Sequence, residues 1–222
     1  MKILPKIVLT LIFFATMQYC FGQKQLSEGT LTYIISIQSA KNEKPVNSNL
    51  NGAELNVYLK PSQSRSEMKS TLGTETNVYD NSVKKGFILK EYSGQKLLIS
   101  LTKENWAQKN QWNDDMKFVV SEELEKIGDY KCKKAVSSTM DGKSFTVYFA
   151  PDIVLSNKKY NNSFEQLPGL PVQYELKSGN LIFTYTLTGL SYEPVSAVKF
   201  EAPKTGFRMM TYEENQQLKK GE

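Results

Sequence analysis

The chain of 222 residues contains no histidine, and this absence limits the chemistry that its other reactive side chains can perform. A Ser-His-Asp triad and a Cys-His pair both need an imidazole as general base. Histidine is also a frequent ligand in zinc and iron sites. The sequence therefore argues against enzymes of these types, and it predicts neither a metal site nor a cofactor.

Cys132 is the one cysteine that follows the first twenty residues, and it stands between Lys131 and the pair Lys133–Lys134. Neighbouring cations can lower the pKa of a thiol and make it reactive. A cysteine inside a strand pattern is more commonly a small buried apolar residue. We expect Cys132 to be buried, and a free reactive thiol is the alternative.

Two groups of carboxylates could support acid–base chemistry of the glycosidase type: Asp114 with Asp115, and Glu122, Glu123 and Glu125. Both groups lie in polar stretches, which predicts exposed surface positions. Neither a Gly-rich phosphate loop nor an oxygen-ligand calcium loop accompanies them. We therefore expect a protein that is not an enzyme, with catalysis by carboxylates or Cys132 as the rival hypothesis.

The charge of the chain gives little reason to expect a nucleic-acid partner. It carries 28 Lys and Arg residues against 23 Asp and Glu, and only Arg65 and Arg208 offer the guanidinium groups that read phosphates and bases. The lysine pairs are scattered along the sequence, as on solvated strand edges and helix ends. An anionic lipid headgroup remains a candidate partner for them.

The first twenty-two residues have the pattern of a secretory signal peptide. Lys2 and Lys6 precede an apolar run from Ile7 to Met17, and Cys20-Phe21-Gly22 supplies small residues at a cleavage site before Gln23. The run is too short to span a bilayer. We expect export to the periplasm or the cell exterior, with cleavage near Gly22. Lipidation of Cys20 is the alternative, although Tyr19 is a poor residue before a lipidated cysteine.

The rest of the chain, residues 23–222, reads as one mainly β domain. Apolar and polar residues alternate with a period of two in segments 30–37, 54–59, 145–150 and 181–188, which predicts half-buried strands of an antiparallel sheet. Turn sequences at 92–95, 140–143 and 177–180 predict hairpins, and the Asp-Gly pair in the second is a strong signal. About nine or ten strands are expected.

Helical signals are few. A short helix is expected over 102–112, carrying Trp106, and another turn over 161–166. Thr211 and Glu214 match a capping box, which predicts a short terminal helix and a polar tail over 212–222. The segment Ser39–Asn51 lacks periodicity and reads as a long loop or a flap.

Several segments resemble a family of exported bacterial proteins named after a Gly-Leu-Pro-Gly-Leu-Ile (GLPGLI) motif, and related uncharacterised secreted proteins. The similarity extends over about residues 28–215 and is carried by segments 127–135, 148–153, 167–175, 200–203 and 206–211. Gln166 and Pro171 depart from the motif. The resemblance implies the lipoprotein-carrier (LolA-like) fold: a strongly curved antiparallel sheet, or half-open barrel, with short helices over its concave face. In carriers of that fold the concavity holds acyl chains.

The motif itself reads as structural. Pro168 fixes its own φ angle and Gly169 permits a tight turn, while Leu167 and Leu170 would anchor that turn on the sheet. None of these side chains is a catalytic type.

Two functions remain for a non-enzymatic envelope protein. In the first, a lipid or other hydrophobic ligand lies in the concave sheet, and aromatic and aliphatic residues form its wall. In the second, the same residues fill a packed core, and the protein is a structural or interaction module with an envelope protein as partner. For the first, the expected wall consists of Trp106, Phe145, Val147, Phe149, Phe183 and Tyr185.

Overall fold

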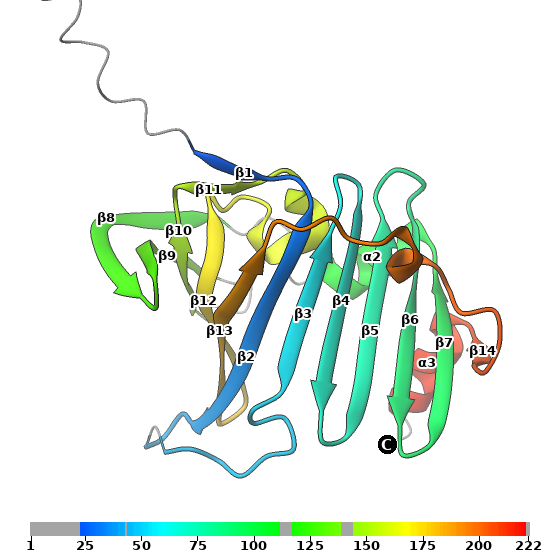
Figure 1. Cartoon of the computed structure of the whole chain (residues 1–222). Coiled ribbons are helices and arrows are strands. Elements are labelled where there is room, and N and C mark those ends of the chain that lie inside the picture. The colour runs from blue at the N-terminus through cyan, green and yellow to red at the C-terminus, as the bar shows by residue number, and fades with distance from the viewer. Residues whose placement is uncertain (1–22, 43, 112–116, 139–143, 221–222) are drawn as a thin grey trace, which may run out of the picture.

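The computed structural model describes residues 23–42, 44–111, 117–138 and 144–220, and most of them lie in β-strands (Figure 1). Twelve strands form one sheet in a fixed spatial order: β14 (Arg208–Met210), β7 (Gln95–Leu101), β6 (Lys85–Tyr92), β5 (Gly73–Asp80), β4 (Gln63–Ser70), β3 (Glu54–Leu59), β2 (Gly29–Ser39), β13 (Leu181–Ser191), β12 (Leu170–Ser178), β10 (Ser144–Ala150), β9 (Tyr130–Ser138) and β8 (Phe118–Ile127).

Neighbouring strands of this sheet are antiparallel except for β14 and β7, which run parallel. A small second sheet pairs β1 (Lys24–Leu26) with β11 (Ile153–Leu155), also in parallel. The described residues thus hold fourteen strands, more than the nine or ten expected. The excess comes from strands such as β4, whose sequence QSRSEMKS has few apolar residues to reveal the period of two.

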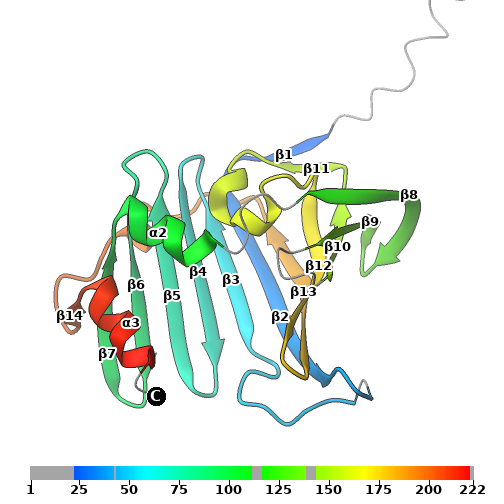
Figure 2. The same cartoon turned by 180° about the vertical axis from the view of Figure 1, so that it is seen from behind.

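The large sheet is strongly bent, and its helices lie on the concave face. Figure 2 shows α2 (Lys103–Asn110), α3 (Tyr212–Lys220) and the 3₁₀ turns η2 (Lys158–Tyr160) and η3 (Asn162–Phe164) on one face, toward which β8 and β9 curl. The sheet stays open, with β14 and β8 as its edges. The predicted fold class, an open curved sheet with short helices over its concave face, is confirmed.

Local sequence signals place the turns and helix ends. Ser93 and Gly94 both have positive φ, as a tight hairpin between β6 and β7 requires, and Gly94 adopts it without steric cost. At the start of α3 the backbone N–H of Glu214 donates to Thr211 Oγ1, while Glu214 Oε2 accepts from the N–H of Thr211. The predicted capping box and the two predicted helices are therefore confirmed. Residues 140–143, for which the sequence predicts an Asp-Gly turn, lie outside the described residues.

The convex face is covered in part by a strap, which we define as residues 192–207 between β13 and β14. It includes the 3₁₀ turn η4 (Ala197–Phe200) and crosses the sheet in front of β5 and β6 in Figure 1. Val195 and Phe200 of the strap are buried against Val78, Phe87 and other apolar side chains of β5–β7. The strap therefore closes a second, smaller hydrophobic core on the side opposite the helices.

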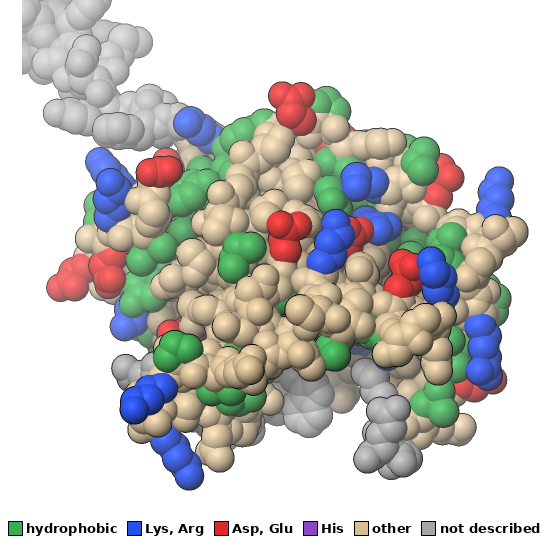
Figure 3. Space-filling view, turned by 60° about the horizontal axis from the view of Figure 1, so that its bottom comes forward, with side chains coloured by type: hydrophobic (Ala, Val, Ile, Leu, Met, Phe, Trp, Pro, Cys, Tyr) green, Lys and Arg blue, Asp and Glu red, His purple; other side chains and the backbone are tan. Residues whose placement is uncertain are grey.

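Elsewhere the convex face is polar. Thr32 Oγ1 donates to Asn56 Oδ1 at 2.8 Å, and the Arg65 guanidinium pairs with Glu67 and donates to the carbonyl oxygen of Lys199 in the strap at 2.9 Å. Figure 3, turned so that the bottom of Figure 1 comes forward, shows acidic and basic side chains side by side and only scattered hydrophobic ones. Within the described part of the chain, no helix combines the length and apolar character needed to cross a membrane.

Candidate functional site

The concave face holds a cavity of about 320 Å³ between the sheet, α2 and the turns η2 and η3. Most of its wall is apolar or aromatic and comes from strands far apart in the sequence, with Leu55 and Val57 on β3, Tyr174 on β12 and Tyr185 on β13. Phe164 of η3 and Phe145 of β10 line the same space. The register explains this convergence, because Tyr174 pairs with Tyr185, and Tyr185 pairs with Ile35 of β2.

The aromatic rings pack against one another at one end of the cavity, which we call the aromatic chamber. Tyr174 and Tyr185 are stacked with ring centroids 4.6 Å apart, and Phe164 meets Tyr174 edge-on at 4.9 Å. The Tyr33 hydroxyl donates to the Pro171 carbonyl oxygen at 2.8 Å, which satisfies that group inside the fold. Such contacts fix the rings and leave an ordered apolar wall.

The tyrosines of this chamber are electrically neutral. Burial raises the pKa values of Tyr33, Tyr160 and Tyr174 well above the ordinary value for tyrosine, because a phenolate would lose its hydration there. Nearby tyrosines add to this effect on Tyr33. The chamber therefore presents uncharged aromatic surface at every physiological pH.

The other end of the cavity is polar, and we call it the polar end. It is lined by Ser66 of β4, by Glu75 and Asn77 of β5, and by Lys109 and Asn110 of α2. Glu75 accepts from Asn77 Nδ2 and from the Tyr92 hydroxyl, both at 3.4 Å. Burial, together with the Glu75 carboxylate, raises the pKa of Tyr92 to about 12, so Tyr92 stays a donor.

Helix α2 holds Trp106 over the sheet between these two ends. The indole stacks on Tyr79 with ring centroids 4.2 Å apart and an interplanar angle of 6°. The Thr102 side chain accepts from the backbone N–H of Asn105, while the Asn105 side chain accepts from that of Thr102, so the first turn is capped in both directions. Asn105 also donates to Glu213 of α3 at 2.9 Å, which ties the two helices together.

The structure brings Trp106, Phe145 and Tyr185 to this cavity and places the other three expected wall residues elsewhere. Val147 and Phe149 are buried in the main core, and Phe183 packs beside Ile35 and Ile37. Sequence reasoning missed Tyr33 and Tyr174, whose strands have the same alternation, and it missed the polar end entirely. Alternation identifies a face of a strand, but it does not show which part of that face lies beneath a helix.

Those residues that raised the question of catalysis and that the structure describes do not line the cavity. Cys132 is fully buried, and burial raises its pKa to about 11, which is the opposite of activation. Glu122, Glu123 and Glu125 are exposed on the edge strand β8, as expected, whereas Asp114 and Asp115 lie outside the described residues. Among the residues that the structure describes, no three His, Cys, Asp or Glu side chains cluster closely enough to hold a metal.

The motif of residues 167–170 lies beside the main core. Leu167 and Leu170 are buried, Pro168 is exposed, and Gly169 backs onto the β10 backbone: a Cβ atom there would lie 2.3 Å from the Ala150 carbonyl oxygen. Gly169 does not have a positive φ, so the close approach to Ala150 is what demands a glycine.

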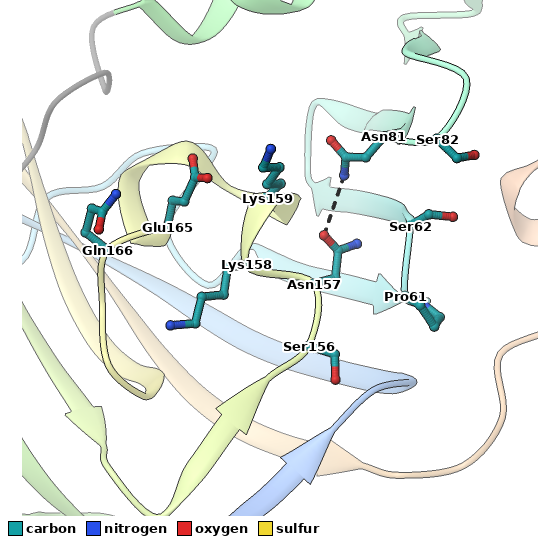
Figure 4. Close-up of a pocket in the computed structure, with 10 residues that line it drawn as sticks. All are labelled: Pro61, Ser62, Asn81, Ser82, Ser156, Asn157, Lys158, Lys159, Glu165 and Gln166. Carbon is teal, nitrogen blue, oxygen red and sulfur yellow. Dashed lines mark hydrogen bonds between the residues drawn. The ribbon is translucent and has the colours of Figure 1, made fainter.

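A larger cavity of about 500 Å³ opens on the surface between the β3–β4 turn and η2 (Figure 4). Asn81 and Asn157 point toward one another in Figure 4, but Ser62 and Ser82 point away from Lys158 and Lys159, so the polar side chains do not gather around one point. Asn157 is used structurally: its amide donates to the carbonyl oxygens of Lys60 and Gln63 at 2.9 and 3.1 Å. This cavity is a polar surface hollow, and the concave cavity is the better candidate for a ligand site.

No family model and no curated protein matches the sequence. Among solved structures, an uncharacterised conserved protein from Thermus thermophilus is 11% identical with a TM-score of 0.45, over 81% of this chain and 90% of that one. The Mycobacterium tuberculosis lipoprotein LppX is 10% identical with a TM-score of 0.38, over 86% and 98%. PNGF-II is 12% identical with a TM-score of 0.44, over 82% of this chain, which spans only 31% of PNGF-II. These are distant similarities of fold.

Proposed function

We propose that this protein binds a hydrophobic ligand in its concave cavity and does so in the cell envelope, without catalysing a reaction. The observation that supports this most directly is the aromatic chamber, where fixed neutral rings surround unfilled space next to a roof of short helices. The volume of about 320 Å³ lies at the lower end of the range of small-molecule sites. It suits a ligand with one chain better than a ligand with two.

A leader-like sequence at residues 1–22 motivates the envelope location, which is likewise a proposal. The shape of the site supports binding over packing. Leu176 of β12 lines the cavity and is 40% exposed, and we take this partly exposed apolar wall as the opening through which an apolar chain enters.

The opening allows a test in which the core is left intact. Leu176→Glu places a carboxylate at the mouth of the cavity, where an entering chain would strip its water. We expect the affinity for tetradecanol, measured by native mass spectrometry of residues 23–222, to fall by about tenfold or more. The matched control is Ile34→Glu, because Ile34 is 36% exposed on the convex face of the same sheet.

Equal losses in the two variants, or no binding by the unmodified protein, would contradict the proposal. If the unmodified protein binds no ligand, the alternative function, a structural or interaction module of the envelope, is favoured. A specific observation favours it: β8 is an edge strand with unpaired backbone groups, and its Val119 and Leu124 are 79% and 60% exposed. A protein partner could add a strand there.

A further inference from the structure

The polar end of the concave cavity lies next to a second hollow on the same face. That hollow, of about 370 Å³, lies between β5, β6 and the helices α2 and α3. Glu75 and Lys109 line both spaces, so they mark the junction between the aromatic chamber and a polar compartment. A ligand whose tail fills the chamber would therefore bring its head to Glu75.

The hydrogen bonds at this junction leave acceptors unsatisfied. Asn77 Oδ1 is buried and has no hydrogen-bond partner among the described residues. Glu75 receives two bonds of 3.4 Å, which is long for a charged acceptor, and a carboxylate has room for about four. A buried acceptor without a donor costs free energy, and a ligand that donates to it recovers that cost.

The two lysines nearby each have a partner, and Lys90 lies opposite Glu75 in the pairing of β5 with β6. Lys90 Nζ donates to Asn215 Oδ1 of α3 at 3.0 Å, and Lys109 Nζ lies 6.0 Å from the centre of the Trp106 ring. At the polar end the groups with spare capacity are thus the oxygen atoms of Glu75 and Asn77, whereas the Tyr160 hydroxyl, which is also buried without a hydrogen-bond partner in the described part of the chain, belongs to the aromatic chamber. They match a hydrogen-bond donor and disfavour a head that carries only acceptors.

We propose that the ligand is a single-chain amphiphile whose head donates hydrogen bonds, as a hydroxyl or an ammonium group, to Glu75 and Asn77. This inference rests on the proposed function, because the tail must occupy the aromatic chamber. The shared chemistry is donation. The affinities of a hydroxyl head and an ammonium head should differ, because the Glu75 carboxylate attracts an ammonium more strongly than an alcohol.

Four probes that share one chain test the head group: tetradecanol, tetradecylammonium, myristate and methyl myristate. Dissociation constants are measured by native mass spectrometry and by calorimetry on residues 23–222. We expect at least one donor head to bind about tenfold more tightly than methyl myristate, and myristate to bind no better than the ester. Tightest binding of the ammonium identifies a cationic head, and tightest binding of the alcohol identifies a hydroxylated one.

Two variants locate the effect. Glu75→Gln and Asn77→Ala should each reduce the preference for the donor head over the ester by about fivefold or more, and leave the affinity for the ester itself within about twofold. The matched control is Glu54→Gln, since Glu54 and Asn56 form a similar pair on the convex face, with Asn56 Nδ2 donating to Glu54 at 2.5 Å.

Equal binding of all four probes, or a donor preference that survives both variants, would overturn the head-group inference and leave the proposed function standing. Failure of every probe to bind would overturn both.

Discussion

Glu67 carries the ion pairs at the centre of the convex face. Only 8% of this residue is exposed, and its carboxylate contacts the Arg65 guanidinium and, at 3.0 Å, Lys69 Nζ. Burial opposes its ionisation, but the hydrogen bonds from Arg65 and Lys69 outweigh burial, so its pKa is lowered from 4.5. Because Arg65 also holds the strap through the Lys199 carbonyl oxygen, the charge of Glu67 contributes to the stability of both layers.

Replacing the Glu67 carboxylate should therefore lower the free energy of unfolding by an amount that depends on pH. We expect Glu67→Gln to lower the free energy of unfolding by about 2 kcal/mol at neutral pH. A pKa that is lower in the folded state gives stability that is fully present above the unfolded value of 4.5 and is lost as pH falls through the folded value. The difference between the two proteins should shrink accordingly in urea titrations at decreasing pH.

Glu123→Gln on β8 is the control, since Glu123 is exposed and should contribute little at either pH. A difference between Glu67→Gln and the unmodified protein that stays constant down to about pH 3 would contradict the assigned role of the Glu67 charge.

At the level of residues, the sequence predicts which faces are apolar better than it predicts a site. Phe145 and Tyr185 are predictable as wall residues, because aromatic residues on alternating strands usually face a covered side, and Trp106 is the large aromatic residue of a short helix expected over that side. Glu75 and Asn77 are not, because polar residues at alternate positions of β5 look like a solvated face. They lie inside only because α2 crosses above them.

At the level of elements, Gly169 directly precedes β12 and lies close against the backbone of β10. Gly169→Ala would place a Cβ atom 2.3 Å from the Ala150 carbonyl oxygen, which neither β10 nor β12 can move to avoid without breaking their register. We expect it to lower the free energy of unfolding by about 2 kcal/mol, measured by urea denaturation.

Gly189→Ala serves as the control, because the nearest atom to its Cβ would be Thr32 Cβ at 3.3 Å, which requires a shift of only a few tenths of an ångström. If the two variants are equally stable, the contact with Ala150 is not what requires Gly169.

The elements with strong local chemistry are predictable from the sequence. The capping boxes of α2 and α3 and the hairpin at 92–95 each depend on residues a few positions apart. Strands β4 and β8 are harder to predict, because Ser, Arg, Glu and Lys dominate β4 and a run of Ser, Glu and Lys interrupts the apolar residues of β8. Their conformation is imposed by pairing with neighbours and not by their own residues.

For the molecule as a whole, stability depends on a segment with almost no regular structure. Phe200 of the strap is 8% exposed and fills the convex core with Val78, Phe87, Leu89 and Leu98. We expect Phe200→Ala to lower the free energy of unfolding by about 3 kcal/mol in urea titrations, as truncation of a core aromatic does.

Val198→Ala is the comparison, since Val198 lies in the same 3₁₀ turn but is 69% exposed, and the loss there should stay below about 0.5 kcal/mol. Similar losses of unfolding free energy in the two variants would mean that the Phe200 side chain is not what holds the strap on the sheet. Nothing in the sequence indicates this layer, because a coil segment has no periodicity from which burial can be inferred.

The pairing of β2 with β13 sets an order in time. Thr30 pairs with Ser191 and Ser39 pairs with Leu181. The first long strand, β2, can therefore complete its pairing only after β13, near the end of the chain, has formed. Strands β2 to β7 are consecutive in the sequence and can pair as a meander without the rest of the chain. One edge of β2 stays unpaired until β13, which ends at Ser191, pairs with it. Folding therefore requires a long-range closure, which is slow, and until it occurs β2 has an open edge that can pair with another molecule.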